Sequence, residues 1–147
     1  MKIISRTLIA AIALATASVA FAEGEPSDPH VIAWEELMKK NGGAVKVLAD
    51  MVGGKAAFDA AAAATAKEAL IAASAAIPDT FKDQATDPAS EAKPEIWTNW
   101  DDFVAKANAL TTAATALDVA SVDTLKVSMG AIGGACKDCH TTYRLAD

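Results

Sequence analysis

The chain has 147 residues, of which 52% are hydrophobic, and it carries 13 basic against 19 acidic side chains. This length fits one domain with one core. The net charge of −6 argues against a nucleic-acid partner, because the negatively charged phosphates of nucleic acids bind basic protein surfaces. An acidic surface can instead steer association with a basic protein, or it can serve solubility alone.

The first 22 residues have the pattern of a secretory signal peptide. Lys2 and Arg6 precede an apolar run over residues 8–20, and Ala20-Phe21-Ala22 is a small-x-small cleavage site. An uncleaved membrane anchor is the alternative, but the run is short for a span. We therefore predict cleavage after Ala22. The remaining domain, residues 23–147, is expected to be exported to the periplasm and to have no membrane association after cleavage. Without Lys2 and Arg6 this domain has 11 basic and 19 acidic residues.

The abundance of alanine and the absence of alternating apolar and polar runs favour helices. The first helix is expected to begin with Asp28 as N-cap and Pro29 at the first helical position, and to end at Gly53-Gly54. Apolar and small polar residues recur along it at helical spacing: Trp34, Leu37, Met38, Asn41, Val45, Leu48 and Val52. Gly42-Gly43 should weaken its middle by about 1 kcal/mol per glycine.

A second helix is predicted from about residue 56 to residue 77, where Pro78 should stop it. Residues 79–93 form the longest connection, which we interpret as an ordered crossover. A third helix should open at Pro94-Glu95 and continue with an apolar stripe to Leu117. A fourth should start near Ser121, a fair N-cap. Four antiparallel helices around an internal cofactor form the simplest all-α architecture, a four-helix bundle.

The fourth helix carries the most specific motif of the chain, Cys136-Lys137-Asp138-Cys139-His140. C-x-x-C-H is the signature of covalent haem c attachment. Cys136 and Cys139 can form thioether bonds with the two vinyl groups of haem, and His140 can then ligate the iron. At 3.6 residues per turn these three side chains project from one side of the helix.

Other uses of the two cysteines are less well supported. A thioredoxin-like redox pair normally follows a strand in a βαβ unit, and no such pattern is visible. A zinc site lacks its second half, because His30 is the only other histidine and no second cysteine pair exists. A simple disulfide is compatible with an exported protein. The histidine directly after Cys139 favours haem.

A C-terminal C-x-x-C-H on the last of four helices resembles the class II cytochromes c, the cytochrome c′ family. The resemblance covers the mature chain and includes the segments 37–42, 58–59, 93–97 and 136–144. It implies a left-handed four-helix bundle with His140 as the proximal iron ligand. Homodimers are common in the family and form largely through the first two helices, but the sequence leaves monomer and dimer open.

The resemblance places the distal iron position on Met38, which makes the chain similar to the low-spin branch with a methionine sixth ligand. A thioether suits Fe(II) and raises the reduction potential, although methionine also packs well as core filler. Met51 and Met129 are weaker candidates. Many cytochromes c′ carry an arginine four residues before this position, where this chain has Trp34. Trp34 is expected to pack beside the haem or at its edge.

Arg144 lies one turn after His140 and could contact a haem propionate; the alternative is an exposed terminal charge. From these features we predict a periplasmic one-electron carrier with a six-coordinate His140/Met38 haem, exchanging electrons with redox partner proteins. The alternative is a five-coordinate cytochrome c′-type protein that binds NO or CO. No catalytic set of side chains is visible, so we do not expect an enzyme.

Overall fold

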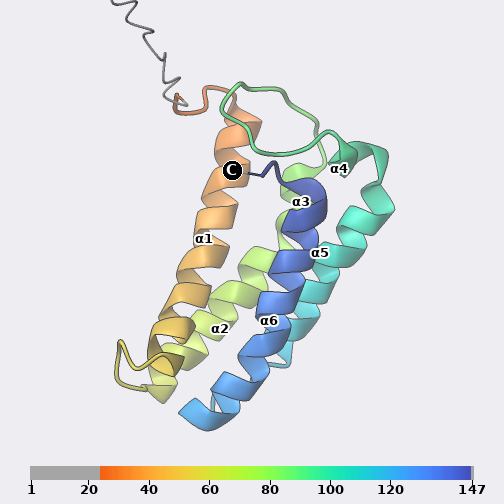
Figure 1. Cartoon of the computed structure of the whole chain (residues 1–147). Coiled ribbons are helices and arrows are strands. Elements are labelled where there is room, and N and C mark those ends of the chain that lie inside the picture. Colours follow the sequence, from red (N-terminus) through yellow and green to blue (C-terminus); the bar gives the residue numbers. More distant parts are fainter. Residues whose placement is uncertain (1–23, 147) are drawn as a thin grey trace, which may run out of the picture.

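A computed structural model describes residues 24–146, and its helices form an antiparallel bundle (Figure 1). The predicted signal peptide lies outside the described residues. The helical segments are α1 (Pro29–Val52), α2 (Ala60–Ala75), α3 (Ile77–Phe81), α4 (Glu95–Thr98), α5 (Trp100–Thr115) and α6 (Val122–Tyr143). The long helices α1, α2, α5 and α6 alternate in direction and lie side by side, so the predicted all-α four-helix bundle is confirmed for these residues.

Helices α1 and α6 begin as their sequences predict. The Asp28 carboxylate accepts hydrogen bonds from the backbone N–H groups of His30 and Val31, with Pro29 at the first helical position. The Ser121 hydroxyl accepts a hydrogen bond from the backbone N–H of Thr124. In return, the Thr124 hydroxyl accepts a hydrogen bond from the backbone N–H of Ser121. Such capping boxes satisfy N–H groups that have no partner within the helix.

The predicted second helix was wrong at both ends. It begins four residues later than expected, because the Asp59 carboxylate caps it by accepting from the N–H of Ala62. Pro78 was expected to end the helical stretch, but the short helix α3 follows α2 and contains Pro78 in its first turn. A proline is tolerated there because the N–H groups of a first turn have no helical acceptor.

The predicted third helix is interrupted at Asn99. The short α4 ends there, and Asn99 leaves the helical conformation with φ −121° and ψ 42° before α5 begins at Trp100. The carbonyl of Asn99 accepts hydrogen bonds from the N–H of Phe103 and from the Tyr143 hydroxyl of α6. By contrast, α1 continues through Gly42-Gly43, because packing of an amphipathic face outweighs low local propensity.

The core runs the length of the bundle and ends in a cluster of aromatic rings. Its fully buried side chains include Val31, Leu48, Ala63, Leu70, Ala114, Leu125 and Ile132. In the cluster, Trp34 of α1 stacks on Phe81 at 5.1 Å between ring centroids and lies 5.2 Å from Trp97. Phe103 then links Phe81 to Tyr143 of α6. Aromatic packing therefore joins α1, α3, α4, α5 and α6 at this end of the bundle.

One stretch of the described residues, Ala60–Phe81, is long and apolar enough to cross a membrane by length and composition alone. It packs within the bundle and supplies core residues such as Leu70 and Phe81. Core helices pass the same test, so this stretch is weak evidence for a membrane span.

The crossover between α3 and α4 is fastened to the ends of both α1 and α6. The Asp87 carboxylate accepts hydrogen bonds from the backbone N–H groups of Ser27, Asp28 and Ala89 at 2.8–2.9 Å. At the other end of the loop, the N–H of Lys93 donates to the carbonyl of Tyr143. The expected ordered crossover is therefore confirmed, and it ties the entry of α1 to the exit of α6.

The hydrogen bonds to Asp87 lower the pKa of its carboxyl group to about 2, chiefly through the N–H groups of Ala89, Asp28 and Ser27. A lowered carboxyl pKa contributes stability that is present above about pH 4 and is lost as the pH falls toward 2. We therefore expect Asp87→Asn to have a shallower loss of stability than the wild type over this range, measured by urea denaturation. Asp83→Asn is the matched control, because Asp83 makes no hydrogen bond to the residues that the structure describes. Equal acid profiles for wild type and Asp87→Asn would contradict this role.

Candidate haem-attachment site

The C-x-x-C-H motif occupies the last two turns of α6. Cys136 and Cys139 are free thiols, half-buried and packed against the hydrophobic core. His140 is exposed, as are Lys137 and Asp138 between the two cysteines. The helix therefore packs both cysteine side chains against the bundle core and leaves His140 exposed.

The surroundings of the motif disfavour the charged form of all three side chains. Burial raises the pKa of the Cys139 thiol to about 11 and also raises that of Cys136. Partial cover by the surrounding chain lowers the pKa of His140, and the Arg144 cation lowers it further, while Glu91 opposes this. A neutral imidazole has a free nitrogen lone pair, which is the form that ligates a metal.

The residues around the motif fit a haem group. Two thiols with three-residue spacing and an adjacent imidazole are the donor set that covalent haem c requires. Half-buried apolar side chains of α1 and α6 lie against the core without being fully covered, among them Met38, Val45, Met129 and Ala135. A flat apolar ring would cover such a surface. No group of three or more His, Cys, Asp or Glu side chains that could hold a metal ion occurs in residues 24–146.

Three methionines occupy distinct positions relative to this motif. Met38 is half-buried on α1, the helix that lies beside α6 and runs in the opposite direction (Figure 1). Met51 is buried in the last turn of α1, more than three turns from Met38. Met129 lies on α6 itself. Met38 is therefore the methionine on a neighbouring helix that retains accessible surface.

Asn41 follows Met38 by one turn of α1. Its side chain is buried at 7% exposure, and its amide nitrogen donates to the carbonyl of Leu37 at 3.0 Å. Its Oδ1 atom has no hydrogen-bond partner among the residues that the structure describes. An unpaired buried acceptor costs about 1–3 kcal/mol, so this position is one where the protein is not optimised for stability.

Arg144, expected as a propionate contact or as an exposed charge, is exposed and forms an ion pair with the crossover loop. Its Nε atom donates to Glu91 Oε2 at 2.5 Å, and Leu145 donates its N–H to the carbonyl of Glu91. This pair holds the end of α6, one turn beyond His140, to the loop between α3 and α4. Glu91 was not identified from the sequence, because 53 residues separate it from Arg144.

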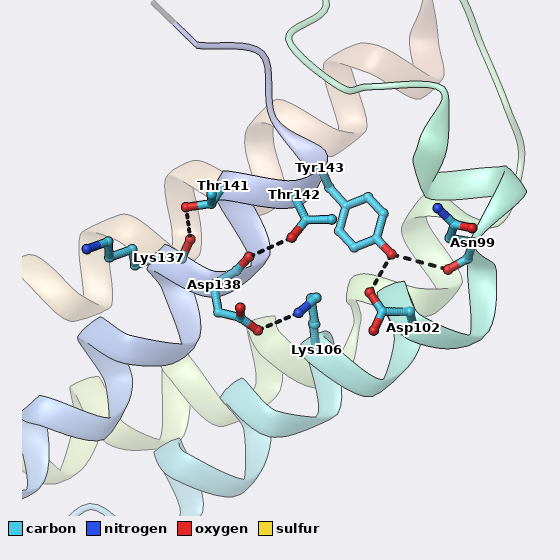
Figure 2. Close-up of polar contacts among 8 residues, drawn as sticks. All are labelled: Asn99, Asp102, Lys106, Lys137, Asp138, Thr141, Thr142 and Tyr143. Atoms are coloured by element: carbon cyan, nitrogen blue, oxygen red, sulfur yellow. Dashed lines mark hydrogen bonds and ion pairs between the residues drawn. The ribbon is translucent and has the colours of Figure 1, made fainter.

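Polar contacts between α5 and α6 were also missed; they involve Asp138 within the motif and Tyr143 one turn after Cys139 (Figure 2). Lys106 donates to the Asp138 carboxylate at 2.5 Å. The Tyr143 hydroxyl donates to Asp102 Oδ2 at 2.6 Å, and burial together with this carboxylate raises the pKa of Tyr143 to about 12. Asp102 and Lys106 are four residues apart and so share a helix face, which was the available sequence signal; their partners on α6 could not be derived from it.

A four-helix bundle with C-x-x-C-H on its last helix defines a c-type cytochrome. The Cytochrome C′ family profile matches residues 31–144 of this chain. The chain therefore belongs to the cytochrome c′ family, whose members bind haem c covalently.

Relatives and solved structures agree with this assignment. Cytochrome c-556 of Agrobacterium fabrum is 40% identical over 117 residues, covering 76% of this chain and 77% of that protein. The structure of oxidized Rhodopseudomonas palustris cytochrome c556 superposes with a TM-score of 0.72 at 26% identity, covering 82% of this chain and 99% of that one. A ferrous variant of Alcaligenes xylosoxidans cytochrome c prime with bound NO has a TM-score of 0.70 at 25% identity, covering 80% and 94%.

Proposed function

We propose that this protein is an electron carrier in which His140 and Met38 ligate the haem iron from opposite faces. Haem supplies a single iron that changes between Fe(III) and Fe(II). The chain supplies two thioether attachments through Cys136 and Cys139, a neutral imidazole, and a soft thioether. The observation that carries the proposal is the position of Met38, half-buried on the helix beside α6.

Several features support a role as an electron carrier over a role as an enzyme. The two cysteines and His140 are committed to the haem, so no nucleophile and base remain paired in the motif. Among the described residues the side of α1 near Met38 offers Asn41, whose amide already donates to the helix backbone, and the exposed Lys39 and Lys40. A thioether on the iron also fills the position where a substrate would bind. We therefore propose no enzymatic role.

The compartment and the partners belong to the same proposal. Export by the signal peptide over residues 1–22 would deliver the chain to the periplasm, where haem is attached to reduced thiols. The acidic surface of residues 23–147 favours a redox partner with a basic docking face. The alanine-rich face of α2 would also accept a second copy of the chain, so a homodimer is compatible with this function.

The optical spectrum of the purified, reduced protein tests the proposal. If Met38 ligates the iron, the wild-type haem is six-coordinate and low-spin, and CO binds only as fast as the thioether leaves. A five-coordinate, high-spin spectrum of the wild type would eliminate the His140/Met38 carrier.

Such a spectrum would support the second candidate, a protein that binds NO or CO at an open distal face. The specific observation in its favour is the similarity to a cytochrome c prime whose structure contains bound NO. In that case Met38 would be core filler at the haem edge, and its thioether would have no contact with the iron.

A further inference from the structure

Asp138, between the two cysteines of the motif, is held by a lysine from another helix. Lys106 lies on α5 and donates from Nζ to Asp138 Oδ2 at 2.5 Å, across 32 residues of sequence. The pair differs from Glu35–Lys39 and Lys46–Asp50, which each join neighbouring turns of α1. It fastens the segment that carries Cys139 and His140 to α5 (Figure 2).

The two charges of this pair are unequally exposed. The Lys106 side chain is 20% exposed, whereas that of Asp138 is 66% exposed. A charge covered by protein acts on its neighbours more strongly than one in water. The hydrogen bond to Asp138, opposed by desolvation, raises the pKa of Lys106, so its ammonium remains charged at all physiological pH values. The field of this cation also reaches the neighbouring Cys139 sulfur.

We propose that Lys106 is a positioning and tuning residue of the haem site: its ion pair with Asp138 fixes the attachment segment against α5, and its covered cation favours the reduced haem. The tuning rests on the proposed electron-carrier function, whereas the ion pair does not. Oxidised haem iron carries one more positive charge than reduced iron, so a nearby cation destabilises the oxidised form. Asp138 compensates part of this field.

The two charges predict shifts of opposite sign in the reduction potential. Lys106→Met removes the cation and leaves the Asp138 anion alone, so the potential should fall. Asp138→Asn removes the anion that pairs with Lys106 and leaves Asp102 of α5 as the acidic neighbour of this cation, so the potential should rise. We expect each single variant to change the equilibrium constant for reduction by at least about threefold, which is about 28 mV at 59 mV per tenfold for one electron. The double variant should lie closer to the wild type than either single variant.

The test is spectroelectrochemical titration of the haem-loaded full-length protein and its variants. Lys137→Met is the matched control, because Lys137 lies in the same motif but is exposed and points away from Lys106 (Figure 2). Lys106→Arg should retain most of the wild-type potential. Circular dichroism verifies folding, and Asp138→Asn changes an exposed side chain, so it keeps the test valid if Lys106→Met does not fold.

Shifts of the same sign, no shift, or an equal shift in Lys137→Met would overturn the proposal. This outcome is separate from the question of the sixth ligand. The wild-type optical spectrum decides whether Met38 ligates the iron, and the reduction potential can be measured for either coordination state.

Discussion

Replacing Met38 by alanine is expected to convert the haem from six-coordinate low-spin to five-coordinate high-spin. The alanine methyl group cannot reach or ligate iron, and no second methionine of the described chain occupies an equivalent position on α1. If the thioether occupies the iron 90–99% of the time in the wild type, its removal should raise the apparent affinity for CO about 10- to 100-fold. Optical spectra of both oxidation states and CO titration of the reduced protein measure these changes.

Met129→Ala is the matched control for this experiment. Met129 is also half-buried and packed against the core, but it shares α6 with His140 and so cannot approach the opposite face of the haem. Its replacement should leave the spectrum and the CO affinity unchanged. If Met38→Ala has the wild-type spectrum, then Met38 is not an iron ligand, and the carrier proposal loses the observation on which it depends.

Replacing Trp34 by alanine should destabilise the protein by about 3–5 kcal/mol, as for other large aromatic residues in protein cores. Trp34 is 3% exposed, stacks on Phe81, and donates from Nε1 to the carbonyl of Thr80 at 2.9 Å. The alanine variant loses the ring contacts and leaves that carbonyl unpaired. Because folded domains are stable by about 5–15 kcal/mol, this is a large part of the total, measurable by urea denaturation.

Trp34→Phe separates the two contributions of this side chain. A phenyl ring retains stacking on Phe81 but cannot donate to Thr80, so its cost should be about 1–3 kcal/mol. Trp100→Ala is the control for a tryptophan that is half-buried at the same end of the bundle. If Trp34→Ala lowers the free energy of unfolding by no more than Trp100→Ala does, Trp34 is not central to the aromatic cluster.

Trp34 occupies a position where this chain differs from many members of the family. Many cytochromes c′ carry an arginine at this place, and the expectation here was packing beside the haem or at its edge. The structure gives Trp34 two aromatic neighbours, Phe81 and Trp97. At this position Trp34 packs in the core and ties α1 to α3 and α4, at the two ends of the crossover.

Features that depend on a few neighbouring residues could be predicted from the sequence. The caps of α1 and α6 follow from Asp28-Pro29 and Ser121, and the grouping of Cys136, Cys139 and His140 follows from helical periodicity alone. The break at Asn99 could not be predicted, because the Tyr143 hydroxyl that donates to its carbonyl comes from 44 residues later. The continuation of α3 past Pro78 was likewise decided by Phe81, which is buried in the aromatic cluster.

The sequence by itself determined the haem motif, its place on the last of four helices and, through these, the family. The motif and each helix depend on residues close together in the chain, where bond geometry fixes which side chains share a face, and the family follows from the order of these local patterns along the chain. Only the tertiary structure decided which polar side chains meet at the motif and at the end of α6: Lys106 pairs with Asp138, and Glu91 pairs with Arg144. These depend on how helices distant in sequence pack together, because packing of whole apolar faces, not local spacing, sets which polar groups meet.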